Sequence, residues 1–277
     1  MPAVRHSYAI LPAALLVFAT VAGAQDAREK LTINVPASMG REVAEFPRGT
    51  PSTSTGSPIA FGANLHDFYI GAGFQTPVRY HNDSDGGAAI GFGLGDSKDA
   101  IGVDVSLSIL AQFASGDGNW AGVNVKVHRL LENNWAVAVG MQGAVINGKK
   151  PDDPNPNFYG VVSKVMDVKA ATHGWLEAVT VSGGVGDQSF RLEKDIRDHN
   201  NTIGFFGSAA LRYNNRLAVI GDWMQDLSAG VSFVPVESWP LVITVAEADL
   251  TGASGVHLTN KTIRPRTTIG AGFAFKY

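Results

Sequence analysis

The sequence contains no cysteine. Without thiols, the chain has neither the lipidated cysteine of an exported lipoprotein nor a disulfide framework. No apolar run reaches the roughly 20 residues that a membrane-spanning helix needs. Lys and Arg (22) nearly balance Asp and Glu (25), so the basic excess typical of nucleic-acid-binding proteins is missing. Glycine, by contrast, is abundant, with 32 of 277 residues.

The amino-terminal 24 residues have the pattern of an export signal. Arg5 supplies positive charge, Ala9 to Val21 is apolar, and Ala22-Gly23-Ala24 is a small-x-small cleavage site. We therefore expect residues 1–24 to be a cleaved signal peptide. An exported chain without a helix long enough to anchor it is either released or built into a membrane β-barrel.

From Asp67 onward, apolar side chains alternate with small or polar ones, which is the period of a β-strand. This pattern predicts twelve strands, an even number as bacterial single-chain barrels require. Their expected ranges are 68–76, 88–95, 101–112, 120–130, 135–146, 157–167, 175–187, 203–213, 217–224, 228–235, 240–248 and 267–277.

The composition of the less apolar face indicates which β architecture the strands form. Val103, Val105 and Leu107 share one face of their strand, and Asp104 and Ser106 lie on the other. Across the strands this second face is mostly Gly, Ala and Ser, which suits a narrow interior better than a water-exposed surface. We predict an all-β fold for residues 66–277: a transmembrane antiparallel up-and-down β-barrel of about 12 strands, closed by pairing of the first strand with the last. A soluble secreted sandwich is the alternative.

The connections between strands alternate between short and long, as in barrels with short periplasmic turns and long surface loops. The link at 224–227 is an exception, because it falls on the surface side and is very short. At 214–216 we expect a three-residue turn that pairs Tyr213 with Leu217, since apolar residues then face each other.

The last strand ends in Phe273, Phe275 and Tyr277 on one face, with small residues between them. It resembles the closing strand of bacterial outer-membrane β-barrel proteins of the porin-like type, whose terminal aromatics are read by the insertion machinery. The blocks at 85–96, 126–140 and 221–244 are similar to an uncharacterised, cyanobacterial-type family of outer-membrane proteins. The resemblance implies a location in the cell outer membrane and a barrel fold, but no activity.

Residues 25–65 differ from the rest, with four prolines and the run TPSTSTGSP. Such low-complexity, turn-rich sequence is typical of a mobile segment. We interpret it as a flexible periplasmic arm; a plain linker and a plug inside the barrel are the alternatives. Because it lacks a regular apolar pattern, we expect that deleting residues 25–60 changes conductance little.

Two groups of side chains are predicted to have roles set by their place in the barrel. Polar residues on the inward face should line the lumen: Asp104, Lys126, His128, Gln142, Lys164, Arg212, Asp222 and Lys276. Tryptophans near strand ends should form the interface belts of a membrane barrel: Trp120, Trp135, Trp175, Trp223 and Trp239.

No convincing catalytic, cofactor or metal motif is present. Asp104 is expected within reach of His128, which we interpret as part of an ordinary lumen ion pair rather than a proton-transfer cluster. Asp83-Ser84-Asp85-Gly86 matches part of a calcium loop but lacks its closing Glu, so a solvated turn is the preferred interpretation.

The sequence therefore favours an outer-membrane barrel that acts as a narrow, porin-like channel for small solutes. A non-conducting structural or surface-binding barrel is the alternative, and an outer-membrane enzyme is the least favoured. The expected partners are membrane lipid and the insertion machinery, with no nucleic acid; the sequence does not indicate an oligomeric state.

Overall fold

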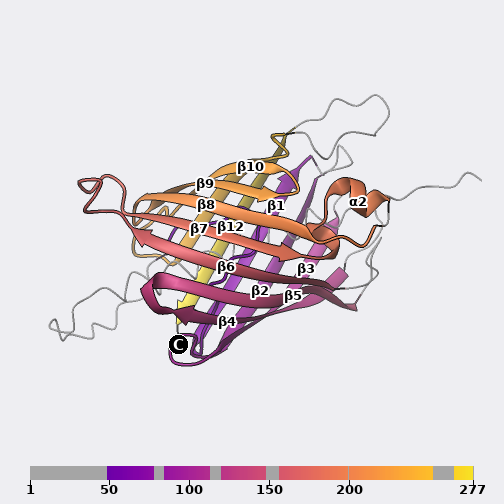
Figure 1. Ribbon diagram of the computed structural model, residues 1–277, viewed down its shortest axis with the longest axis horizontal. Coiled ribbons are helices and arrows are strands. Elements are labelled where there is room, and N and C mark those ends of the chain that lie inside the picture. Colours follow the sequence, from indigo (N-terminus) through magenta and orange to yellow (C-terminus); the bar gives the residue numbers. More distant parts are fainter. Residues whose placement is uncertain are drawn as a thin grey trace, which may run out of the picture.

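The computed structural model describes residues 49–77, 84–112, 120–147, 156–198, 200–251 and 265–276. Its strands are β1 (Asp67–Thr76), β2 (Asp85–Gly95), β3 (Gly102–Gln112), β4 (Trp120–Leu131), β5 (Trp135–Asn147), β6 (Asn157–Asp167), β7 (Ala178–Gly186), β8 (Gly204–Asn214), β9 (Leu217–Met224), β10 (Leu227–Phe233), β11 (Leu241–Ala248) and β12 (Arg266–Lys276). Two 3-10 turns, η1 (Glu132–Asn134) and η2 (Gln188–Phe190), and the short helix α2 (Glu193–Arg197) lie between strands (Figure 1).

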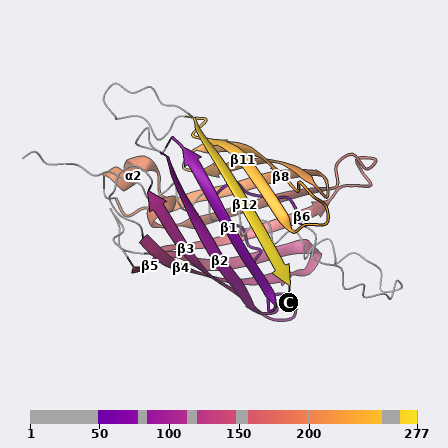
Figure 2. The same cartoon turned by 180° about the vertical axis from the view of Figure 1, so that it is seen from behind.

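The twelve strands form one closed antiparallel barrel in which each strand pairs with its neighbours in the sequence. The first and last strands close the sheet, with a register that runs from Asp67 opposite Lys276 to Thr76 opposite Thr267. Figure 2 shows β1 directly beside β12. The predicted strand number and closure are confirmed, and the sandwich alternative is wrong.

Alternating side chains divide the barrel wall into an inner and an outer face. Every one of the twelve strands presents at least one large apolar side chain outward that is more than a third exposed, with extremes at Val139 (61%) and Phe205 (72%). Contiguous apolar surface on this scale is not found on ordinary soluble monomers. The outer surface therefore has the character expected of a lipid-facing barrel.

The two ends of the barrel differ in their connections. We call the end that holds the β2–β3, β4–β5, β6–β7, β8–β9 and β10–β11 links the turn end, and the opposite end the loop end. The β9–β10 link at the loop end comprises only residues 225–226, so the expected exception is present. At the turn end, Arg212 pairs with Ala218, as the three-residue turn requires. The expected pairing of Tyr213 with Leu217 is wrong, because Tyr213 is bulged out and Asn214 pairs with Leu217, which leaves a two-residue turn.

The main difference from the sequence-based expectation concerns residues 49–64, which we call the inner segment. Every residue from Gly49 to Asn64 is buried. The segment starts at the turn end, where Gly49 N donates to Trp239 O, and returns to that end, where Leu65 N donates to Gly95 O. Between these points it contacts Asp222, close to the loop end of β9. The inner segment thus enters the barrel, turns and leaves on the same side.

The prediction of a flexible arm is therefore wrong for residues 49–64; residues 25–48 lie outside the described residues. The expectation assumed that docking needs a regular apolar pattern. Instead, the backbone of the inner segment forms hydrogen bonds to polar side chains of the wall, and such bonds need no sequence periodicity.

Small inward residues make room for this packing. A Cβ atom at Gly93 would overlap the backbone of Ala63 and Asn64, and one at Gly91 would overlap the ring of Tyr69. The glycine-rich inner face is therefore filled by the inner segment and by aromatic rings from neighbouring strands.

Candidate functional site

The candidate site is the barrel interior, where the wall meets the inner segment. Asp104, Lys126, His128 and Asp222, predicted to line the lumen, are all buried there. Gln142 and Arg212 also lie on the inward side of their strands and are half-buried. The interior is therefore polar in its lining, although it is occupied by residues 49–64.

Lys164 does not line the lumen, so that prediction is wrong. It alternates with the buried Ser163, lies opposite the exposed Trp135, and its ammonium group is 5.0 Å from the centre of the Trp135 ring. The inward residues of β6 are instead Tyr159, Val161 and Ser163. The inward placement of Lys164 depended on apolar side chains facing lipid, whereas Tyr159 and Val161 point inward and contact the apolar part of the inner segment.

The closing strand places its aromatic residues outward at the turn end. The rings of Phe273 and Phe275 lie 5.3 Å apart, and Phe275 lies 6.2 Å from Phe68 on β1. Lys276 is the last described residue, paired with Asp67 and exposed at the mouth rather than enclosed in the lumen. Tyr277 lies outside the described residues.

Four of the five tryptophans can be placed, and all four are exposed near strand ends. Trp135, Trp175 and Trp239 are at the turn end, and Trp223 is one residue from the loop end of β9. Trp120 begins β4 at the loop end, but its side chain lies outside the described residues.

Asp104, Lys126 and His128 dock the returning half of the inner segment. Lys126 Nζ is 3.5 Å from Asp104 Oδ2 and also donates to Phe61 O. Asp104 accepts hydrogen bonds from Tyr69 Oη at 2.7 Å and from Ala63 N at 3.3 Å. The Asp104 carboxylate and the Lys126 ammonium therefore compensate each other's charge. Burying either charge without a partner would cost much free energy.

His128 contributes to the same docking site through its imidazole. Its Nε2 is 3.0 Å from Ala63 O. The carbonyl can only accept, so Nε2 carries the proton in this contact. The predicted cluster of Asp, Lys and His is therefore a binding surface for the backbone of residues 61–63.

Asp222 holds the tip of the inner segment. Its Oδ2 accepts from three successive backbone N–H groups, those of Thr55 (2.9 Å), Gly56 (3.1 Å) and Ser57 (3.2 Å). The hydroxyl groups of Ser54 and Ser57 donate to the same oxygen at 2.7 and 3.1 Å. Successive N–H groups that converge in this way form an anion-binding nest. The carboxylate of the wall is thus wrapped by the segment.

Serine hydroxyl groups of the wall hold the rest of the backbone. Ser52 N donates to Ser232 Oγ at 2.7 Å, and Ala60 N donates to Ser163 Oγ at 2.9 Å. Ser163 Oγ is in turn 2.8 Å from Ser182 Oγ. The wall therefore meets the inner segment with polar contacts from β3, β4, β6, β9 and β10.

One side of the interior is apolar. Ile59 and Phe61 of the inner segment join a buried cluster with Tyr159, Phe190 and Phe206. The rings of Phe190 and Phe206 are 4.8 Å apart, and the rings of Tyr159 and Phe190 are 5.9 Å apart. Phe190 belongs to η2, so part of the β7–β8 connection folds into the barrel. The sequence signal for this cluster was Phe206, which broke the alternation of β8.

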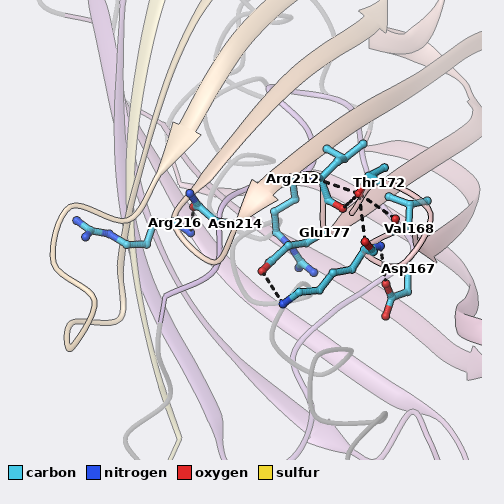
Figure 3. A network of polar contacts seen from close by, with 9 residues as sticks. Asp167, Val168, Thr172, Glu177, Arg212, Asn214 and Arg216 are labelled. Carbon is cyan, nitrogen blue, oxygen red and sulfur yellow. Dashed lines mark hydrogen bonds and ion pairs between the residues drawn. The ribbon is translucent and has the colours of Figure 1, made fainter. Parts of the chain in front are cut away.

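A second polar network lies at the turn end (Figure 3). Glu177 Oε1 is 3.5 Å from Lys169 Nζ, and Glu177 Oε2 is 3.8 Å from Arg212 Nε. Thr172 fixes the intervening turn through hydrogen bonds to Val168 O and Leu176 O. Arg212 therefore stabilises the β6–β7 turn through Glu177.

At the loop end, Arg266 forms a buried ion pair with Asp249, and its Nη1 donates to Gln75 Oε1 at 2.7 Å. This pair neutralises two further charges of the interior. Among the described residues, no group of three or more His, Asp or Glu side chains is arranged to hold a metal ion. No helix in this part of the chain is long and apolar enough to cross a membrane.

Comparison with known proteins gives no match to a family model and none to a curated protein sequence. The cyanobacterial-type family therefore stays a prediction. The architecture itself, a closed antiparallel barrel with an apolar exterior, is compatible with an outer-membrane barrel.

Proposed function

We propose that the chain is an outer-membrane β-barrel that forms a narrow passage for small solutes, and that its inner segment holds this passage closed. The observation that supports the proposal is the burial of residues 49–64 inside a closed barrel by polar contacts from five strands. In this arrangement the turn end faces the periplasm and the loop end faces the outside.

The kind of contact favours a displaceable segment. Net stabilisation by one hydrogen bond is only about 0.5–1.5 kcal/mol between neutral groups and about 1.5–3 kcal/mol with a charged group such as Asp222, because water replaces the lost partner when the bond opens. The wall side chains that hold the inner segment are Asp, Lys, His and Ser, which water solvates readily. A released segment would therefore leave a lumen that is polar except on the side of Tyr159, Phe190 and Phe206.

A specific observation favours the second candidate, a permanently closed structural or surface-binding barrel. Ile59 and Phe61 pack with Tyr159, Phe190 and Phe206, and burying such side chains contributes about 1.5–3 kcal/mol each. If this cluster never opens, the barrel conducts nothing and its loops are its working surface.

The proposal includes no enzymatic activity. Membrane lipid and the insertion machinery are its partners, the latter through the strand that contains Phe273 and Phe275.

A disulfide between the inner segment and the wall tests the proposal. A Cβ atom at Gly230 on β10 would lie 2.9 Å from Thr55 Cγ2, and also 2.6 Å from Ala246 Cβ and 2.8 Å from Val245 O. G230C alone therefore requires a local shift of the wall, and the single variant G230C is the control for that crowding. A disulfide places a Cβ and the far sulfur about 3 Å apart, given an S–S bond of about 2.05 Å. The double variant T55C/G230C should therefore lock the segment, and no other cysteine competes.

Planar-bilayer recordings of this variant should show openings under reducing conditions and none after oxidation, with recovery on adding reductant. The single variants T55C and G230C serve as controls and should not respond to oxidation. If neither the wild type nor the reduced double variant conducts current, the structural barrel is favoured. If the oxidised and reduced forms of the double variant conduct equally, closure by the inner segment is refuted.

A further inference from the structure

Asp222 lies in a row of oxygen-bearing side chains that crosses three strands. Ser208 on β8 and Ser228 on β10 are its direct cross-strand neighbours, and all three side chains are buried on the inner face. Direct neighbours in an antiparallel sheet have Cβ atoms about 4.5–5.5 Å apart. A carboxylate is thus flanked by a hydroxyl group on each side.

Two observations indicate that this row is a ligand site rather than wall packing. Ser208 Oγ is buried and has no hydrogen-bond partner among the described residues. Asp222 forms no ion pair within that part of the chain, whereas Asp104 is paired with Lys126 and Asp249 with Arg266. Among the described residues, the hydrogen bonds to its carboxylate come from the inner segment.

The residues above and below the row define the shape of the site. Met224 and Phe206 lie on the same inner face toward the loop end, and Ile220 and Ala210 lie toward the turn end. The anionic row is therefore bordered by apolar side chains on both sides along the strands.

We propose that Asp222, Ser208 and Ser228 bind the ammonium group of a small primary amine with an apolar body, and that residues 54–57 occupy this site when the barrel is closed. An ammonium group offers three N–H donors and one positive charge. The inner segment presents three backbone N–H groups to the same oxygen. The segment and the amine would thus use the same acceptor, and the flanking apolar residues would contact the body of the amine.

This inference rests on the proposed function, because it names the solute class of the same passage. Since the two occupants exclude each other, the amine releases residues 54–57 by competition. At an amine concentration about ten times its dissociation constant, the ratio of released to docked segment should rise about tenfold.

Thiol labelling measures this release without requiring conduction. Thr53 is buried, and its hydroxyl group has no hydrogen-bond partner among the described residues. T53C therefore removes no hydrogen bond from that part of the chain. The full-length T53C protein in phospholipid vesicles is treated with a water-soluble maleimide at increasing n-butylammonium concentrations. While the released form is a minority, the labelling rate should rise in proportion to the released fraction, by about tenfold when the amine reaches about ten times its dissociation constant for the released barrel.

Tetramethylammonium, which carries the same charge but no N–H donor, and n-butanol, which lacks the charge, are the matched controls and should not raise the rate. T53C/D222N should label faster than T53C without amine and should not respond to n-butylammonium. T53C/S208A should respond only at higher amine concentrations, which tests the site with the carboxylate intact.

No rise with n-butylammonium, an equal rise with tetramethylammonium, or a response that persists in T53C/D222N would overturn the inference. These results are distinct from a failure of the proposed function. If oxidised T55C/G230C conducts as the reduced form does, closure by the inner segment is refuted whatever the labelling shows, and if neither form conducts, the passage is refuted. If the redox response is present and only the amine response is missing, the closed passage stands and the amine site is refuted.

Discussion

Individual inward glycines fix how closely the inner segment approaches the wall. Gly93 is the clearest case, because the backbone of Ala63 and Asn64 occupies the space that a side chain there would need. In the sequence, Gly91, Gly93 and Gly95 alternate along one strand, a pattern typical of a face that admits bulky neighbours. The pattern does not identify these neighbours, since one is the ring of Tyr69 and another is the backbone of residues 63–64.

Replacing Gly93 with alanine should therefore destabilise the barrel. Overpacking a well-filled interior costs about 1–3 kcal/mol. The free energy of unfolding, from urea titration in phospholipid vesicles, should fall by this amount in G93A. The control is G183A, because a Cβ atom at the outward Gly183 has nothing within 4 Å. Equal stability of G93A and G183A would contradict the close packing of residues 63–64 on β2.

At the scale of elements, alternation was sufficient to predict the strands. All twelve expected ranges coincide with observed strands to within a few residues at their ends. Strand β6 shows where alternation is insufficient. Its two faces carry Tyr159 and Val161 on one side and Phe158 and Val162 on the other, so both are apolar and hydrophobicity alone does not orient the strand.

The outward face of β5 offers a test of lipid exposure. Val139 is 61% exposed in the middle part of the strand, whereas Met166 is exposed near the turn end of β6. An arginine on the lipid face costs about 2–4 kcal/mol at the bilayer midplane and about 0–1 kcal/mol near the interface. V139R should thus lower the free energy of unfolding in vesicles much more than M166R. Similar small effects of both substitutions would indicate a water-facing surface.

For the whole molecule, the sequence predicted the closed barrel but not what fills it. The run of Ser, Thr, Gly and Pro at 51–58 has the composition of a disordered segment, because it cannot form an apolar core by itself. Inside the barrel, polar side chains from five strands supply its hydrogen bonds. These partners are distant in the sequence, Asp222 being more than 160 residues away, so no local pattern indicates the pairing.

The apolar contact of the inner segment should decide how often the passage opens. Phe61 is 2% exposed, and truncating a buried Phe to Ala costs about 3–5 kcal/mol. F61A should therefore spend a larger fraction of time open in single-channel recordings than the wild type. F205A removes the same ring from the outer face, where Phe205 is 72% exposed, and should leave the open fraction unchanged. An open fraction in F61A no higher than in F205A would show that this contact does not control closure.

The path of the inner segment has a topological consequence. Both of its ends lie at the turn end of the barrel, next to Trp239 and Gly95. The inner segment is thus a loop inserted from one end of the barrel. It is not a chain that runs from one mouth of the barrel to the other. An inserted loop can be withdrawn without any chain end passing through the lumen, and the pairing between β1 and β12 stays intact while the loop moves. A segment threaded through both mouths would leave the barrel only if the whole of the preceding chain were pulled through the lumen.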